Sequence, residues 1–460
     1  MALGEAESTR TVRLAEWIHG VRPADLPPEV SRRAKLGVLD TVGAALFGSM
    51  AQELSALRKA TQVYGGSGTA TVWGSAEHTS VQLAALLNGT AAHATELDDF
   101  GGGGHPGAVI VPATLAVGES LHSTGVDIVV AVVVGYEVAE RVAAAMGGYR
   151  VHTQRGWHST GTCCVFGAAA AAGRLLGLSP QQGASALGTA ASFAAGTWAF
   201  LHDGSPVKRL HAGKASEAGV VAAYLAAQGW RGPWFAFEPH WGGVLPTYAG
   251  PEAKPDEVVA GLGQEFRIMN LGIKPYEYAC CRGAHGPLET FLDLIREHGL
   301  RERDISQVEV STSPQHALEL GRQEVANLLH AQLSVPYALA VGLLSGTAGA
   351  EQYSQKWLED PTVKNWCNRI TVIADERLPF GKHGAVRVLT QDGRWYERTV
   401  REAKGGREHP LPEDEVKSKF CRLASYRLKT GAVAEILEQI LRLEKLGDVT
   451  ELVSLLAVRD

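Results

Sequence analysis

Apolar residues recur every three or four positions through most of the first 265 residues, which is the spacing of one helix face. The segment 29–48 keeps this pattern and stops at a glycine, so we predict a helix there. A second helix is expected from about residue 81, with a cap at 79–80. We expect it to carry His93 and Glu96 on one face and to end before the glycines at 101–104.

The next segments continue the helical pattern. Pro112 has the character of a first-turn residue, which predicts a helix that Gly125 closes. The run Ile128–Val134 has the composition of a strand, but it leads directly into a helical pattern, so we predict one helix. Further helices are expected at 168–176, after Ser179–Pro180, and at 214–228. Because alternating strand patterns are almost absent, this part of the chain is predicted to be an all-α domain.

The pattern changes at about residue 270. A helix at 287–298 precedes a strand at 307–312, a helix at 324–344, a strand at 369–374 and a hairpin at 385–400, which turns at Asp392–Gly393. The linker 403–415 leads to a helical segment, 415–456, that we expect to pack back onto the first domain. The predicted fold is therefore mainly α: a large helical domain (1–268 and 404–460) with a smaller α+β domain (269–403).

Composition and charge indicate a globular protein and argue against nucleic-acid-binding and membrane proteins. The chain has 460 residues, 45% hydrophobic and 20% charged, as in ordinary globular proteins. Its 43 basic and 49 acidic residues give a net charge of −6 and no basic stripe, so nucleic-acid binding has no support. The longest apolar run has seven residues, far below the roughly 20 of a membrane span, and we expect no membrane partner.

The cysteines and the first residues indicate the compartment. Six cysteines in a chain of this length indicate reduced thiols, and the adjacent pairs Cys163–Cys164 and Cys280–Cys281 lack the spacing of a CxxC site. The first 17 residues contain acids and no apolar core of a signal peptide. We therefore expect a cytoplasmic protein.

The stretch from His93 to Glu119 holds the densest set of reactive side chains. It is not a phosphate loop, because His105–Pro106 stands where such a loop needs its lysine. It offers the ligand types of a metal site, although HExxH and a second helical metal motif are missing; these residues are His93, Glu96, Asp98, Asp99 and His105. The plainer interpretations are a flexible surface loop at 101–104 and helix-capping acids.

Three more stretches carry chemistry, each with a plain structural alternative. His158 precedes hydroxyl residues that cap a helix; Lys208, Arg209, His211 and Lys214 form a cationic cluster; Lys274, Arg282 and His285 surround two thiols that admit a Cys–His nucleophile. Together they supply histidines for proton transfer and cations for carboxylates. Proton abstraction next to a carboxylate requires these groups.

Several blocks of the sequence, in order, resemble the MmgE/PrpD family. They include LDTVGAALFG (39–48), NGTAAHATELDD (88–99), HPGAVIVPATLAVGE (105–119), GWHSTGTCCVFG (156–167), KRLHAGKASEAG (208–219), the 274–285 stretch and QLSVPYALAVGLLSG (332–346). The resemblance implies a helical domain and a smaller α+β domain, with a cofactor-free active site between them and a homodimeric assembly. It places the family's catalytic side chains on His105, His158, Lys208, Lys274 and Tyr337.

Four departures from the family pattern affect the expected reaction. Glu96 replaces the shorter aspartate that is usual at the first acidic position, and Phe100 replaces the usual threonine or serine after the acid pair. The loss of this threonine counts against decarboxylation. The segment from Lys274 to His285 is longer than usual by about two residues, and four glycines replace polar loop residues.

We therefore predict a cofactor-independent and metal-free lyase, dehydratase-like, that acts on a small di- or tricarboxylate by α-proton abstraction. His105 and His158 would be the acid–base pair, with Asp98 and Tyr337 orienting or relaying protons. Lys208 and Lys274, with Arg282, would bind the substrate carboxylates and stabilise the developing negative charge, and Glu96 would be a further substrate-binding residue. The alternatives are an epimerase that uses the same site, a metal-dependent hydrolase built on His93, Asp98 and His105, and a catalytically inert binding protein.

Overall fold

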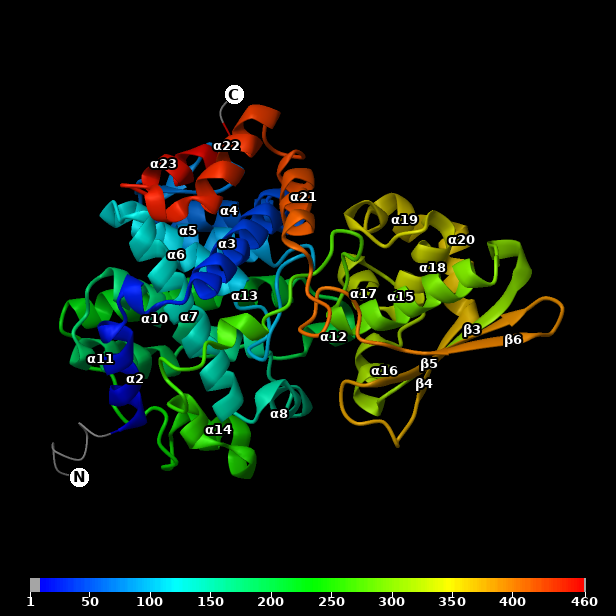
Figure 1. Cartoon of the computed structure of the whole chain (residues 1–460), viewed down its shortest axis with the longest axis horizontal. Helices are drawn as coiled ribbons and strands as arrows, with labels where there is room; N and C mark the ends of the chain where they lie inside the picture. The colour runs from blue at the N-terminus through cyan, green and yellow to red at the C-terminus, as the bar shows by residue number, and fades with distance from the viewer. Residues whose placement is uncertain (1–8, 459–460) are drawn as a thin grey trace.

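The computed structural model describes residues 9–458 and confirms the predicted fold class (Figure 1). One domain is a bundle of helices and the other combines helices with a four-stranded sheet. The helices of the first domain are α2 (Arg10–Gly20), α3 (Pro28–Gly48), α4 (Gln52–Tyr64), α5 (Val81–Ala92), α6 (Gly107–Leu121), α7 (Gly125–Ala145), α8 (Gly148–Gln154), α9 (Ser159–Thr162), α10 (Cys164–Leu175), α11 (Pro180–Ala191), α12 (Phe200–Asp203), α13 (Val207–Ala227) and α14 (Val244–Ala249).

Helix α7 confirms that the Val-rich run at 128–134 is helical. It lies in the middle of the bundle, and almost every residue of it is buried. Gly135 of α7 and Gly167 of α10 face each other, and a β-carbon on Gly167 would lie 2.5 Å from the Gly135 carbonyl oxygen. The two backbones can approach this closely because neither residue has a side chain. Burial on all sides therefore explains a helix made of residues with high strand propensity.

Two predicted helix boundaries in the first domain were wrong. Helix α5 ends at Ala92, so His93 and Glu96 do not share a helix face. Helix α6 begins at Gly107, and Pro112 lies inside it instead of in its first turn. The segment between α5 and α6 is irregular because its polar side chains have partners in the tertiary structure, which outweigh local propensity.

The second domain packs helices against one face of its sheet. It contains α15 (Arg282–Glu297), β3 (Ile305–Thr312), α16 (Pro314–Leu320), α17 (Leu328–Gln332), α18 (Val335–Ser345), α19 (Gln355–Glu359), α20 (Pro361–Arg369), β4 (Ile370–Ala374), β5 (His383–Thr390) and β6 (Trp395–Thr399). The strand order is β4-β3-β5-β6; β3 and β4 are parallel and the other pairs are antiparallel. The hairpin predicted at 385–400 is confirmed, with Gly393 at φ +83°.

The helix predicted at 324–344 is in fact broken in two. The chain leaves the helical path after Gln332, and Ser334 caps α18 by accepting a hydrogen bond from the backbone N–H of Tyr337 (3.1 Å). Pro336 follows in the first turn of α18, where its missing N–H costs nothing. A capping serine and a proline therefore set this boundary.

The C-terminal helices return to the helical domain, as predicted, and both described chain ends lie there (Figure 1). The segment expected as helix at 415–456 consists of α21 (Glu413–Ala424), α22 (Thr430–Leu441), α23 (Thr450–Val453) and short 3₁₀ turns. Helix α21 packs along α3. Between residues 9 and 458 no single helix is long and apolar enough to cross a membrane; α3 and α4 pass that measure only together, across an 88° bend.

A buried ion pair connects α21 to the segments that carry the reactive residues. The Lys419 ammonium lies 2.6 Å from Oδ1 of Asp40 on α3, and both side chains are almost fully buried. The same ammonium donates to the carbonyl oxygens of Leu97 and Lys274 (the latter at 2.9 Å). One side chain thus connects α3, the loop after α5 and the start of the second domain.

We expect Lys419→Met to destabilise the protein by about 3–5 kcal/mol, because it leaves the Asp40 carboxylate buried without a counter-charge. Urea unfolding measures this loss. Lys417→Met on the same helix is the matched control, since Lys417 pairs with Glu413 near the surface and such pairs contribute about 0–1 kcal/mol. The double variant Asp40→Asn/Lys419→Met should recover part of the loss. Equal effects of the two single lysine substitutions would contradict this role.

Candidate active site

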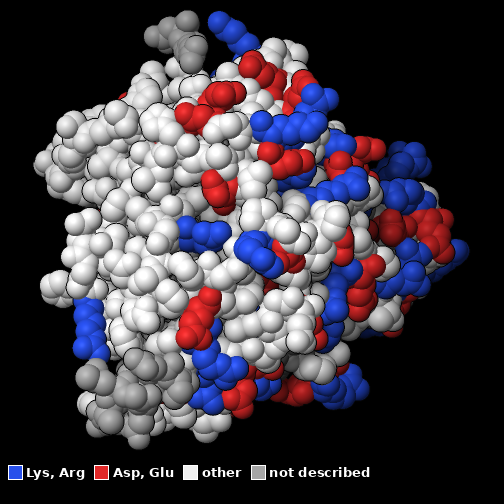
Figure 2. Space-filling view, turned by 60° about the vertical axis from the view of Figure 1, so that its left-hand side comes forward, with Lys and Arg blue, Asp and Glu red and all other residues white. Residues whose placement is uncertain are grey.

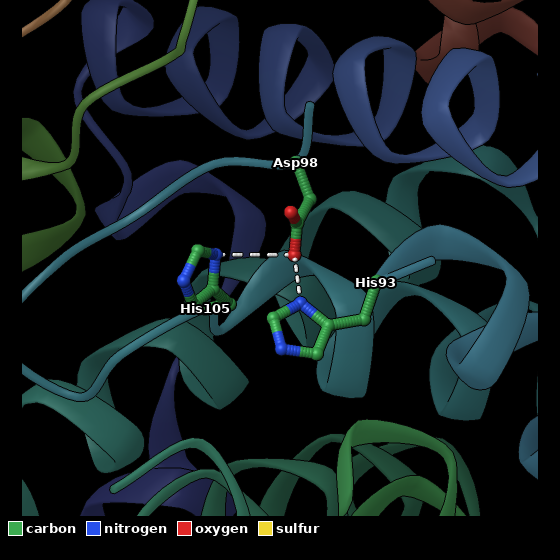
Figure 3. A group of neighbouring side chains, drawn as sticks. All are labelled: His93, Asp98 and His105. Carbon is green, nitrogen blue, oxygen red and sulfur yellow. Dashed lines mark hydrogen bonds and ion pairs between the residues drawn. The ribbon is translucent and has the colours of Figure 1, made fainter. Parts of the chain in front are cut away.

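A buried carboxylate between two imidazoles forms the centre of the site (Figure 3). Oδ2 of Asp98 accepts a hydrogen bond from Nδ1 of His93 at 2.7 Å, and it lies 3.1 Å from Nδ1 of His105. Asp98 and His93 are fully buried, whereas the His105 side chain keeps 14% of its surface exposed. His105 is therefore the member of this trio that a small molecule can reach.

The charges of the trio follow from burial and proximity. Burial lowers the pKa of His93 to about 3, so this ring is neutral at pH 7. Burial alone would raise the pKa of Asp98, but the neighbouring imidazoles His105 and His93 hold it well below the usual carboxyl value. Asp98 is thus a carboxylate that fixes Nδ1 of His93 as a donor and holds the His105 ring in place. This arrangement resembles the carboxylate–histidine pairs of acid–base enzymes.

Glu96 binds the two lysines that were predicted to hold the substrate. It has a left-handed backbone conformation (φ +57°), which is uncommon outside glycine. Its carboxylate pairs with Lys208 of α13 and, at 3.1 Å, with Lys274, which also donates to its carbonyl oxygen (2.9 Å). All three side chains are buried. Burial lowers the pKa of Lys208 to about 7 and also lowers that of Lys274.

A cavity of about 500 Å³ opens in front of His105, between the two domains. The helical domain contributes Phe100, Gly101, Gly104, His105 and Tyr149 to its wall. The second domain contributes Cys281, Arg282, Gly283, Gly286, His316, Glu319, the loop Phe380–His383 and the segment Val400–Ala403. The volume is in the usual range for a small-molecule site. Lys208 and Lys274 do not line this cavity.

Arg282 is the predicted binding residue that does reach the cavity. It begins α15, and its guanidinium donates to the carbonyl oxygens of Ala403 (2.6 Å) and Lys404 (2.7 Å). It also lies over the ring of Phe100, 4.7 Å from the ring centroid. Phe100, noted above as a departure from the family pattern, therefore positions this cation at the wall.

The glycines at 101–104 form a hydrogen-bonded turn and not an open surface loop, because Gly103 and Gly104 are buried. Gly101 and Gly104 exchange backbone hydrogen bonds (2.8 and 3.1 Å), and Glu140 of α7 accepts from the N–H groups of Gly102 and Gly103, both at 2.9 Å. A β-carbon on Gly101 would lie 2.5 Å from Glu140, and Gly104 has φ +94°. Close packing and backbone conformation both require glycine in this turn.

The His93 ring lies between His158 and His105 and contacts both rings. The His158 ring stacks on His93 at a centroid distance of 5.9 Å, and its Nδ1 is 3.1 Å from Nδ1 of His211. Burial lowers the pKa of His158 well below the ordinary value and that of His211 to about 4. The predicted acid–base pair is thus in one cluster, but the central His93, which sequence analysis treated mainly as a metal-ligand candidate, separates its members.

Tyr337 does not belong to this cluster. Its hydroxyl donates to the backbone carbonyl of Gln352 (2.8 Å), and its ring is in the core of the second domain, beside Tyr353. The relay role predicted for Tyr337 has no support in this geometry. Its motif starts α18, which packs on α20 and β4, away from the cavity.

Three further candidate residues from the sequence, Lys214, His285 and Cys280, contact other parts of the protein and do not line the cavity. Lys214 is exposed and pairs with Glu217, so the cationic cluster does not act as one unit. His285 is buried, with Nε2 3.0 Å from the Cys280 carbonyl oxygen, and burial raises the pKa of the Cys280 thiol to about 12. This geometry gives the Cys–His nucleophile no support.

Asp99, which the sequence offered either as a metal-ligand type or as a capping acid, fixes the backbone next to the site. It accepts hydrogen bonds from the backbone N–H of Gly107 (2.9 Å) and the hydroxyl of Tyr136 (2.7 Å). It therefore fixes the start of α6, directly after His105. Burial raises its pKa to about 7. The capping interpretation is thus right for Asp99, and it fails for Asp98.

Among the described residues, the trio of Figure 3 is also the group whose side chains could bind a metal ion. The nitrogen and oxygen atoms of His93, Asp98 and His105 lie within 4.8 Å of one another, so these residues are the ones that could hold a metal ion. Both Nδ1 atoms, however, lie at hydrogen-bonding distance from Oδ2 of Asp98. The His93 contact is a hydrogen bond and the His105 contact an ion-pair contact without hydrogen-bond geometry, so the trio fits an acid–base group.

Comparison with known proteins gives one consistent result. The model of the MmgE/PrpD N-terminal domain matches residues 12–256, and that of the MmgE/PrpD C-terminal domain matches residues 278–445. The chain is 32% identical to the "cis-aconitate decarboxylase-like protein oryM" of Aspergillus oryzae over 98% of both chains. It is 30% identical to a cis-aconitate decarboxylase of Aspergillus terreus (98% of this chain, 96% of the other) and 25% identical to that of Homo sapiens (97% and 94%).

The buried acid that holds the glycine turn predicts a pH dependence of stability. Burial raises the pKa of Glu140 to about 7 from 4.5. The folded protein then keeps a proton that the unfolded chain releases, so the free energy of unfolding falls as pH rises from about 4.5 to 7. Glu140→Gln should flatten this slope by about 1–3 kcal/mol over the window, measured by urea unfolding at several pH values. The exposed Glu435→Gln should keep the wild-type slope; identical slopes in both variants would refute the assignment.

Proposed function

The chain belongs to the MmgE/PrpD family, and from this premise we propose that it is a lyase that acts on a small tricarboxylate or dicarboxylate. The observation that carries the proposal is His105 at the cavity wall, with the Asp98 carboxylate behind its ring. A histidine in this position accepts and returns a proton at the carbon next to a substrate carboxylate. The names of the relatives, all decarboxylases of a tricarboxylate or similar to one, support the substrate class.

His105 can serve two lyase reactions, each of which passes through an enolate-like anion. In a dehydration it takes the α-proton, the electron pair forms the carbon–carbon double bond, and hydroxide leaves as water after protonation. In a decarboxylation the bond to one carboxylate breaks, carbon dioxide leaves, and His105, protonated beforehand from solvent, donates its proton to the carbon that keeps the electron pair. In both reactions Asp98 stabilises the imidazolium, and nearby cations stabilise the enolate-like anion.

The cations take different positions around this anion. Arg282 lies at the cavity wall and binds a substrate carboxylate directly. Lys208 and Lys274 are behind the histidines, bound to Glu96, and they bind substrate only when that carboxylate releases one of them. His158, with His211, completes the proton-transfer cluster behind His93.

Two observations favour different reactions. Similarity over 98% of the chain to proteins named as cis-aconitate decarboxylases favours decarboxylation of a tricarboxylate. Phe100, beside Arg282 at the wall, stands where the family's polar residue is expected, and it favours the dehydration predicted from the sequence. Epimerisation would use the same anion with proton return to the other face.

The remaining expectations are part of the same proposal: no cofactor, a cytoplasmic location and a homodimer. Figure 2 shows a broad area on the side of the helical domain with few charged side chains, while charges of both signs mix over the rest of the view. Depletion of charge is typical of the core of a subunit interface. Light scattering of the purified protein would determine the number of subunits.

The reaction itself can be tested with cis-aconitate and citrate in heavy water, followed by NMR and by release of labelled carbon dioxide. Carbon dioxide identifies a decarboxylase, interconversion of hydroxy acid and alkene a dehydratase, and deuterium exchange alone an epimerase-like site. We expect His105→Asn to lower kcat by about 10²–10⁴-fold. His122→Asn, on an exposed histidine directly after α6, should have no effect.

Three results of this panel would overturn the proposal. Activity that a chelator abolishes and added metal restores would support a metal-dependent hydrolase at His93, Asp98 and His105. Full activity of the His105→Asn variant would remove the assigned acid–base residue. Binding without any exchange or turnover would identify an inert binding protein.

The role of Asp98 gives a second kinetic prediction. Asp98→Asn keeps the shape of the side chain but loses the charge that stabilises protonated His105, so kcat should fall by about 10²–10⁴-fold while KM changes little. The matched control is Asp448→Asn, because Asp448 bonds His122 at 2.8 Å on the surface and should be dispensable. A change in KM alone would assign Asp98 to substrate binding instead.

A further inference from the structure

The part of the cavity wall that the second domain contributes carries two histidines that the proposed reaction does not use. His316 lies on α16 and His383 is the first residue of β5, and both line the cavity. Their ring centroids lie 4.9 Å apart, and the ring planes are tilted by 34° to each other. Two imidazoles from separate elements thus meet at one point of the wall.

His316 is buried and His383 is half-buried, and within the described chain neither ring has all of its hydrogen bonds. His316 is only 9% exposed, and its Nδ1 and that of His383 have no hydrogen-bond partner within residues 9–458. A buried ring nitrogen without a partner costs about 1–3 kcal/mol, so proteins rarely keep two of them together without use. Burial also lowers the pKa of His316 to about 4 and that of His383 to about 3, so both rings are neutral at pH 7.

The N-terminus of α15 faces the same point. This helix has 16 residues, no acidic side chain in its first turn and no side-chain cap. Arg282 and Gly283 of its first turn line the cavity, and a β-carbon on Gly283 would lie 3.4 Å from Nε2 of His316. Free N–H groups at a helix start favour an anion, and the guanidinium of Arg282 adds a full positive charge.

The other charged groups of this wall do not oppose an anion. Lys382 and Arg401 are exposed cations at the rim. Burial raises the pKa of Glu319 to about 7, so much of this acid is protonated at neutral pH. Glu402, 3.9 Å from the Arg282 guanidinium, lies toward solvent. The wall is therefore a set of donors with a net positive charge.

We propose that His316 and His383, with the start of α15, form a second carboxylate site that binds the substrate carboxylate farthest from His105. This inference rests on the proposed function, which it deepens by assigning the residues that select acids with an additional carboxylate. A cavity of about 500 Å³ has room for a six-carbon triacid between the two walls. Selection follows because an acid that lacks the distal carboxylate leaves these donors unpaired.

The test compares cis-aconitate with an analogue that lacks one carboxylate, using wild type, His316→Phe, His383→Phe and His316→Gln. The phenylalanine variants keep an aromatic ring without donors and should raise the KM for cis-aconitate about tenfold or more, with kcat largely kept. Their preference for cis-aconitate over the analogue should shrink by a similar factor. His316→Gln keeps a donor and should recover part of the affinity, which a purely structural role would not predict.

Calorimetric binding to the His105→Asn variant separates this inference from the proposed function. If the second site exists, that variant still binds cis-aconitate, and adding His316→Phe weakens the binding about tenfold. His298→Asn, an exposed histidine just after α15, is the control without effect. Wild-type turnover with unchanged KM and preference in the folded phenylalanine variants would overturn the second site alone. A wild-type protein that neither binds nor converts any of the acids would overturn both proposals.

Discussion

The structure around the site depends on one constraint: charges that leave water must be paired. Glu96 has a left-handed backbone conformation, which costs conformational energy. Ion pairs between its carboxylate and two buried lysines from different parts of the chain offset this cost. Lys419 of α21 is paired in a similar way, since its ammonium binds the Asp40 carboxylate and two backbone carbonyl oxygens. These pairs hold the loop between α5 and α6 in a shape that its local sequence would not adopt.

The reactive histidine benefits from this fixed loop. His105 follows a glycine turn that Glu140 holds and precedes a helix that Asp99 fixes at its first residue. The His105 side chain keeps 14% of its surface exposed and lines the cavity, to which the second domain supplies Arg282 and the tilted pair His316 and His383. Preorganisation of this kind would let the imidazole and the carboxylate act without reorganising during the proposed reaction.

The two domains contribute different parts of the proposed site. The helical domain supplies the proposed proton-transfer cluster, in which each histidine touches another ring or a carboxylate. The second domain supplies the proposed anion donors of the cavity, and the segment between Gly272 and Arg282 links the two domains. Phe100 takes part in both, because its backbone pairs with Gly272 and its ring lies under Arg282.

The sequence by itself determined the fold class, the long buried helices and the 385–400 hairpin, because these follow from local periodicity and turn chemistry. It also singled out His105, Asp98 and Arg282 as candidates, and the structure places His105 and Arg282 at one cavity with Asp98 beside His105; their roles stay predictions. Only the tertiary structure decided that α5 ends at Ala92, that His93 is central, that Glu96 binds both lysines and that Tyr337 lies elsewhere. The reason is physical: these outcomes depend on partners more than 100 residues away for the lysines, or on a backbone conformation that no local pattern encodes.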